Sequence, residues 1–192
     1  MPEIVFVMGK SASGKDTIYK QLVDDKSLKL NTVTMYTTRP MRDGEEQDIT
    51  YHFVSEEDFK QKIEDGFFAE WKTYNTEFGV WYYGTAIEDL ENAEDNNIII
   101  LTPDGYRDVV NKLSNKPISI YVYANNSTIK SRLIKRGDDP KEAERRLLHD
   151  NEDFKGLENE INKIVYNNDD STIEDVTNKI LEIIKELWFW RI

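Results

Sequence analysis

The sequence predicts an α/β protein in which a mainly parallel sheet is flanked by helices and carries an inserted, mixed α+β lobe. Short apolar runs occur at 3–8, 98–101 and 118–123, and each precedes a segment with helical spacing of its apolar residues. Continuous apolar runs are typical of strands buried in a parallel sheet, and the helices between them supply the crossovers. Residues 32–84 interrupt this alternation with an aromatic, turn-rich composition.

The core elements are expected in a simple order along the chain. A helix follows each of the three apolar runs, and a last strand at 161–167 precedes a helix over about 172–187. The apolar positions that predict the first three helices are Ile18, Leu22 and Val23, then Val109, Val110 and Leu113, then Ile129, Leu133 and Ile134.

The region 32–84 is expected to form several short strands and one helix near 55–64, where Ser-Glu-Glu-Asp resembles a capping box. Core strands lie on both sides of this region, so it is an insertion rather than a separate domain. A basic span follows the strand at 118–123, with two helical pieces interrupted by Gly-Asp-Asp-Pro. We therefore expect one domain over 1–192, with a core of 1–31, 85–124 and 155–192, a lobe at 32–84 and a helical segment at 125–154.

Composition excludes several classes of protein. The net charge of −12 argues against general binding to nucleic acid or to anionic membranes. The chain has no cysteine, which excludes disulfides and thiolate metal sites. It also lacks a long apolar span and a secretory signal pattern, so we expect a cytoplasmic protein with no membrane partner.

A glycine-rich loop follows the first strand. From Gly9 the chain reads Gly-Lys-Ser-Ala-Ser-Gly-Lys-Asp-Thr, which matches the phosphate-binding pattern G-x-x-x-x-G-K between a strand and a helix. Backbone N–H groups of such a loop turn toward phosphate oxygens, and the lysine reaches the outer phosphates. The loop residues expected to bind ATP are Gly9, Ser11, Ala12, Ser13, Gly14, Lys15, Asp16 and Thr17.

Asp16 is the unusual residue of this loop, because a Ser or Thr normally follows the lysine. Its carboxylate suits Mg²⁺, and Thr17 beside it offers a hydroxyl, so both are candidate metal ligands. A second role stays open for Asp16, since a negative charge near a helix N-terminus is favoured without any metal.

A longer set of motifs resembles the guanylate kinase family. "YTTRPMRDGEEQDITYHFVSEEDF" is followed by "GFFAEW" and "YYGT", which match in order that family's Thr-Thr-Arg, second Arg, Gly-Glu, Tyr-x-Phe-Val-Ser, Glu-Trp and Tyr-Tyr-Gly-Thr. Together with the loop and "IVYNNDDSTIEDV", the resemblance covers most of the chain. It implies a P-loop NTPase-type kinase that transfers the γ-phosphoryl group of MgATP to GMP or dGMP, with 32–84 as the acceptor lobe and 125–154 as a lid.

The resemblance also implies a phosphate site and a base site in the acceptor lobe. Arg39 and Arg42 would hold the acceptor phosphate with charge-assisted hydrogen bonds, and the hydroxyls of Tyr51 and Tyr83 would complete that site. For the base site, the family pattern assigns the guanine N1–H and amino hydrogens to Glu70, with Thr85 beside the base. Taken one at a time, the two arginines are also compatible with surface charges, and the two tyrosines with core aromatic residues.

The chain departs from the family pattern around the base. Met35-Tyr36 stands where a Ser commonly precedes Thr-Thr-Arg, and Ile100, Thr102 and Asp104 stand in a segment that is Asp-x-Asp-x-Gln-Gly in the family. The stretch "YNTEFGVWYYGT" is also longer than usual, so a longer hairpin is expected to reach the base site. These departures leave the base and the sugar of the acceptor open.

By the same resemblance, the basic span 130–146 supplies lid arginines. Arg132, Arg136 and Arg146 would close over the phosphates, with Arg145 a less certain member. The alternative is a solvated helix pair held by charge pairs with Glu142 and Glu144. The full set of expected catalytic residues is Lys15, Arg39, Arg42, Arg132, Arg136 and Arg146. Asn167 aligns with a family Asn near the adenine of ATP and is otherwise a plain turn residue.

Three functions are compatible with these residues. The first is a guanylate kinase-type phosphotransferase with Mg²⁺ as cofactor and ATP and a nucleoside monophosphate as partners. The second is a deoxynucleoside monophosphate kinase with another base preference, and the third a non-catalytic guanylate-kinase-like binding module. The aromatic end "ELWFWRI" either packs Leu187, Trp188 and Trp190 on the core or forms a dimer contact, so monomer and homodimer both stay open.

Overall fold

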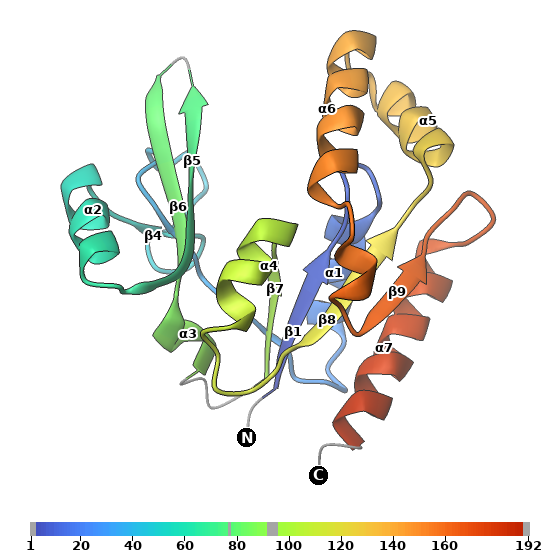
Figure 1. The fold of residues 1–192 in the computed structure, drawn as a ribbon, viewed down its shortest axis with the longest axis horizontal. Coiled ribbons are helices and arrows are strands. Elements are labelled where there is room, and N and C mark those ends of the chain that lie inside the picture. Colours follow the sequence, from blue (N-terminus) through green and yellow to red (C-terminus); the bar gives the residue numbers. More distant parts are fainter. Residues whose placement is uncertain (1–2, 77, 92–95, 190–192) are drawn as a thin grey trace.

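The computed structural model describes residues 3–76, 78–91 and 96–189 (Figure 1). Five parallel strands form the core sheet in the order β2-β7-β1-β8-β9. Their bounds are β1 (Ile4–Met8), β2 (Asn31–Thr32), β7 (Asn97–Ile100), β8 (Ile118–Tyr123) and β9 (Lys163–Tyr166). The first strand is therefore central, and the loop that follows it opens at the carboxyl edge of the sheet.

Side-chain alternation along β1 divides the core into two layers. Val5 and Val7 are fully buried against α1 (Lys15–Asp24) and α7 (Ile173–Phe189). Phe6 and Met8 point to the other face, which α4 (Pro103–Val110) covers together with the segment around η1 (Leu157–Asn159). Both faces of the sheet are covered, which is why the three inner strands β1, β7 and β8 are mostly apolar.

The inserted lobe contains a second sheet in the order β4-β3-β6-β5. Its elements are β3 (Tyr36–Thr37), β4 (His52–Phe53), α2 (Glu56–Glu64), β5 (Phe68–Thr76) and β6 (Gly79–Ala86), and α3 (Ile87–Glu91) leads back to the core. Ser55 caps α2 by accepting a hydrogen bond from the Asp58 N–H, as the capping-box pattern predicted. Antiparallel β5 and β6 form a long hairpin that rises beside the core (Figure 1).

Two helices, α5 (Asn126–Arg136) and α6 (Pro140–Asp153), form the segment after β8. Gly137 ends α5 in the left-handed conformation with φ of 89°, and Asp139 caps α6 ahead of Pro140. In Figure 1 this helix pair and the β5–β6 hairpin stand on opposite sides of the region above the carboxyl edge of the core sheet.

The predicted α/β class, the parallel sheet, the inserted lobe and the helical segment are all confirmed. One helix expectation was wrong in detail. The third apolar position after β7, Leu113, lies beyond α4, which ends at Val110 and continues only as a turn. Ile134 lies within α5, as expected, with its side chain 56% exposed.

Within the described residues, no helix combines the length and apolar character needed to span a bilayer. At the carboxyl end, Leu187 and Trp188 are partly buried against the core, while Trp190 lies outside the described residues.

Candidate active site

The glycine-rich loop connects β1 to α1 and is tightly supported. Ser13 is buried, its N–H donates to the carbonyl oxygen of Lys10, and Gly14 takes the N-cap position of α1 with φ of 93°. Lys15 is the first residue of the helix. The N–H groups at the start of α1 and its partial positive charge therefore face the position where phosphates bind in loops of this kind.

Asn167, the residue after β9, holds the loop in place through a hydrogen bond to its backbone. Its side chain is fully buried, and its Nδ2 donates to the carbonyl oxygen of Ser13 at 2.7 Å. A Cβ on Gly14 would lie 2.4 Å from that Nδ2, so the glycine is required both for its backbone conformation and for space. The neighbouring Asn168 is tied elsewhere, because its Oδ1 accepts from the Asn125 N–H.

The helix α6 also contacts the loop. The Ser11 N–H donates to Asp150 at 2.7 Å, and the Lys10 ammonium donates to Asn151 at 2.5 Å. Burial lowers the pKa of Lys10, and the negative charge of Asp150 opposes this change. A carboxylate of the lid region thus interacts with one loop N–H group.

Asp16 does not occupy the N-cap of α1, which belongs to Gly14, but is the second residue of the helix. Its carboxylate is 72% exposed and lies 3.0 Å from the Lys15 ammonium. Thr17 beside it is exposed as well. Both candidate metal ligands are therefore accessible at the edge of the phosphate loop.

In the lobe, Arg39 is the most constrained arginine. It is 5% exposed and makes two hydrogen bonds to Glu45, at 2.9 and 2.7 Å. Its guanidinium lies over the rings of Tyr51 and Phe53, at 5.4 and 5.7 Å from their centroids. The hydrogen bonds with Glu45 raise the pKa of Arg39, and contact with Tyr83 adds to this effect.

The predicted phosphate residues of the lobe therefore gather in one place. Tyr51 and Tyr83 contact each other with ring centroids 6.0 Å apart, and both lie close to Arg39. Arg42 is exposed at the same turn, where its N–H donates to Glu45 at 2.7 Å.

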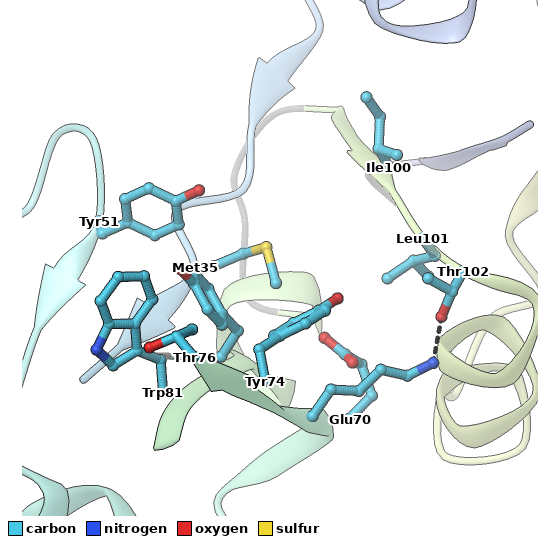
Figure 2. A pocket seen from close by; sticks show the side chains of 11 residues that line it. Met35, Tyr51, Glu70, Tyr74, Thr76, Trp81, Ile100, Leu101 and Thr102 are labelled. Carbon is cyan, nitrogen blue, oxygen red and sulfur yellow. Dashed lines mark hydrogen bonds between the residues drawn. The ribbon is translucent and has the colours of Figure 1, made fainter. Parts of the chain in front are cut away.

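A cavity of about 490 Å³ lies between the hairpin and the end of β7 (Figure 2). Its lining residues are Met35, Tyr51, Glu70, Lys72, Tyr74, Thr76, Trp81, Tyr83, Ile100, Leu101 and Thr102. Figure 2 shows Tyr51 and Trp81 on one side of this cavity and Ile100, Leu101 and Thr102 on the other. Three positions at which the sequence departs from the guanylate kinase pattern therefore line the same cavity, namely Met35, Ile100 and Thr102.

Glu70 is the buried carboxylate of this cavity. It is 5% exposed, and its Oε1 accepts from the Thr85 hydroxyl at 2.7 Å. Burial raises the pKa of Glu70, while the hydrogen bond from Thr85 and the charges of Lys72 and Lys112 lower it. Its Oε2 lies 3.4 Å from the place a Cβ would take on Gly105, so the carboxylate lies close to the first turn of α4.

The lid arginines fall into two groups. Arg132 reaches the loop, with Nη1 3.3 Å from the carbonyl oxygen of Ser13. Arg136 and Arg146 pair with acidic residues of the same helical segment, Asp138 and Glu142. The hydrogen bonds with Asp138 raise the pKa of Arg136, with a smaller contribution from the charge of Asp16.

Several lining residues were not anticipated. Lys72, Tyr74, Thr76 and Trp81 belong to the cavity, and Asp150 contacts the loop. The signal for the first three was present, because they continue the period-two alternation that starts at Glu70 on a single strand.

The glycine-rich loop joins a buried parallel strand to a helix at the carboxyl edge of a sheet that helices cover on both faces. This arrangement defines a protein of the P-loop NTPase class. Within that class, the family model described as guanylate kinase matches residues 1–187. The chain belongs to the guanylate kinase family.

Individual relatives agree with this assignment. A guanylate kinase of Helicobacter pylori is 34% identical over 188 residues, covering 96% of this chain and 87% of the relative. One from Campylobacter jejuni is 33% identical over 159 residues, covering 80% and 76%. The crystal structure of guanylate kinase from Anaplasma phagocytophilum has a TM-score of 0.66 over 96% of this chain and 85% of that one, at 17% identity, which supports the fold alone.

Proposed function

We propose that this protein is a nucleoside monophosphate kinase that transfers the γ-phosphoryl group of MgATP to GMP or dGMP, giving ADP and the nucleoside diphosphate. The observation that carries the proposal is the cavity beside Arg39, because it joins a phosphate-binding cluster to a buried carboxylate. Membership of the guanylate kinase family, and relatives that bear that name, support it.

On the donor side, the loop N–H groups and Lys15 hold the outer phosphates of ATP. Gly14 supplies the left-handed conformation that the loop needs, and Asn167 holds that conformation from below. Because Asn167 is fully buried, its contribution is to position the loop through the Ser13 carbonyl oxygen.

On the acceptor side, Arg39 and Arg42 bind the monophosphate, with the hydroxyls of Tyr51 and Tyr83 as further donors. Glu45 presets the Arg39 guanidinium, so little side-chain entropy is lost on binding. Glu70 accepts hydrogen bonds from the base and is itself oriented by Thr85.

The attacking oxygen belongs to an acceptor phosphate that is already anionic, so no general base is needed. Rate acceleration comes from positioning and from neutralising charge on the moving group. Arg132, Arg136 and Arg146 supply positive charge from the lid, after Arg136 and Arg146 exchange their present acidic partners for phosphate oxygens.

Mg²⁺ bound with the nucleotide neutralises charge on the phosphate oxygens. Asp16 and Thr17 would hold it, since exposed carboxylate and hydroxyl oxygens suit this hard cation. Within the described ranges, no group of three or more His, Cys, Asp or Glu side chains could hold a metal ion.

The test is an assay of ADP release with MgATP and each of GMP, dGMP, AMP, CMP, UMP and dTMP. Strong preference for GMP or dGMP is expected. Preference for another base would replace the proposal with a respecialised monophosphate kinase. ATP-dependent thermal stabilisation without turnover on any acceptor would instead favour a binding module.

A further inference from the structure

Lys72 places a positive charge inside the cavity, directly next to Glu70 on the same strand face. Side chains of β5 alternate, so Glu70, Lys72, Tyr74 and Thr76 all line the cavity while their neighbours point away. On β6, Thr85 pairs with Glu70, and Tyr83 pairs with Lys72. The side chains of Glu70 and Lys72 are therefore next to each other on the same face of β5.

The Lys72 ammonium is held at the far wall of the cavity. It donates to the Thr102 hydroxyl at 2.5 Å, drawn as a dashed line in Figure 2, and lies 3.9 Å from Asp104. Both partners belong to the amino-terminal end of α4, since Thr102 caps that helix. An ammonium has three hydrogens, so it keeps donor capacity for a ligand beyond the bond to Thr102.

Glu70 and Lys72 therefore present opposite hydrogen-bonding characters side by side. An ionised carboxylate only accepts, and an ammonium only donates. A base that satisfies both must carry a donor and an acceptor at neighbouring positions of one edge. The N1–H and the O6 carbonyl of a 6-oxopurine have this arrangement, with the donor at position 1. Adenine has the reverse order, an acceptor at N1 and an amino donor at position 6, so with position 1 facing Glu70, as the proposed function has it, the 6-oxopurine satisfies both side chains and adenine satisfies neither.

We infer that Lys72 is a specificity residue of the acceptor site, donating a hydrogen bond to the O6 carbonyl of a 6-oxopurine while Glu70 accepts from N1–H. The inference rests on the proposed function, because it assigns a ligand to the same cavity. It gives the lysine the role of recognising O6, in a cavity that Met35 and Thr102 also line.

A simpler role for Lys72 would be to offset the charge of Glu70 without touching the base. Lys112, in the turn after α4, offers a comparison, because its charge also acts on Glu70. The Lys112 ammonium donates to the carbonyl oxygen of Ala69 at 2.5 Å and does not line the cavity. The charge of Lys72 acts on Glu70 more strongly than that of Lys112, so an electrostatic effect alone would change both variants in the same direction. Recognition of O6 would instead confine the change in preference for O6 to Lys72.

The experiment compares kcat/KM for GMP and for 6-thioguanosine monophosphate in the parent protein, Lys72→Met, Lys72→Arg and Lys112→Met. The thio analogue keeps N1–H and the 2-amino group but replaces O6 with sulfur, a weaker acceptor. We expect Lys72→Met to lower kcat/KM for GMP roughly 10- to 100-fold, the range for a hydrogen bond to a charged group. The preference for GMP over the thio analogue should fall toward one.

Lys72→Arg should retain most of the preference for GMP, and Lys112→Met should retain the parental ratio. Thermal unfolding of each variant shows whether it is folded at the assay temperature. If Lys72→Met keeps the parental ratio, or if Lys112→Met changes it equally, the inference is wrong while the kinase assignment stands. If the parent protein does not phosphorylate GMP, the proposed function and the inference both fail.

Discussion

The two halves of the candidate site recognise their ligands with different parts of the chain. The phosphate loop relies on backbone groups, and the side chains of Asn167 and Arg132 support it by donating hydrogen bonds to the carbonyl oxygen of Ser13. The cavity in the lobe relies on side chains, with Glu70 and Lys72 side by side among aromatic and aliphatic residues. Substitution at a loop position such as Asp16 therefore leaves the loop intact, whereas substitution in the cavity changes what can bind.

The largest effect is expected from a substitution that disturbs the backbone of the phosphate loop. Gly14→Ala should reduce kcat/KM by more than about 100-fold, because a Cβ would lie 2.4 Å from Asn167 Nδ2 and φ is +93°. The measurement is steady-state kinetics with both substrates, together with thermal unfolding. Gly44→Ala is the matched control, since its φ is also positive but nothing lies within 4 Å of its Cβ position. Equal losses from both variants would contradict the special role of Gly14.

The side-chain half is tested by Glu70→Gln, which should lower kcat/KM for GMP by about 50-fold with little change in the Kd for ATP. The amide keeps an acceptor for the Thr85 hydroxyl but replaces one acceptor of the carboxylate with a donor. Kinetics with GMP and calorimetric titration with ATP separate the two sites. A similar loss of ATP affinity would show that the two halves are not independent.

The same variant should gain stability at neutral pH. Burial raises the pKa of Glu70 in the folded protein, so the ionised carboxylate weakens the fold at high pH, and this cost disappears as the pH falls below the pKa of the unfolded chain. The Tm difference between Glu70→Gln and the parent should therefore be largest near pH 8 and shrink toward pH 4. A difference that widens on acidification would contradict the direction of the shift.

Arg39→Lys should raise the KM for GMP by about 20-fold, because a lysine cannot reproduce the two hydrogen bonds to Glu45 or present a planar fork to phosphate. Arg42→Lys should have a smaller effect, since Arg42 is exposed and a single positive charge remains. Initial-rate kinetics with GMP give both values. The reverse order would mean that Arg42 is the principal phosphate ligand.

Asp16→Ser is expected to have the smallest effect. Without a metal, the carboxylate repels phosphate, so the gain in ATP affinity on adding Mg²⁺ should fall by about threefold when Asp16 is replaced. ATP titrations with and without Mg²⁺ measure this gain. Asp24→Ser, in the last turn of the same helix, is the control for charge alone. An unchanged gain in Asp16→Ser would remove Asp16 from the metal site.

Much of the architecture followed from the sequence because its elements carry strong patterns. The strands at 4–8, 97–100 and 118–123 are almost entirely apolar because both faces of the sheet are covered, and their polar residues are Asn97 and Ser119. By contrast, β2 is two exposed polar residues, Asn31–Thr32, whose pairing with β7 depends on tertiary structure. No local period could identify that strand.

The site divides in the same way. Gly14 and Lys15 are recognised from fixed spacing, and Arg39, Glu70 and Tyr83 from an ordered set of motifs. Asp150 and the loop residue Ser11 are far apart in the sequence and meet only because α6 leans on the loop. Contacts of that kind have no local signature, so the structure is needed to find them.

The position of β1 has a consequence for the order of assembly during synthesis. Its hydrogen-bonded neighbours are β7 and β8, so Ile4 aligns with Asn97 and Val5 with Ile118. Closing such distant segments costs chain entropy before any contact repays it. A ribosome that has released the acceptor lobe but not yet β7 still holds an unpaired first strand, which gains its second neighbour only when β8 follows. The nucleotide loop acquires its contacts with α6 and Asn167 later still.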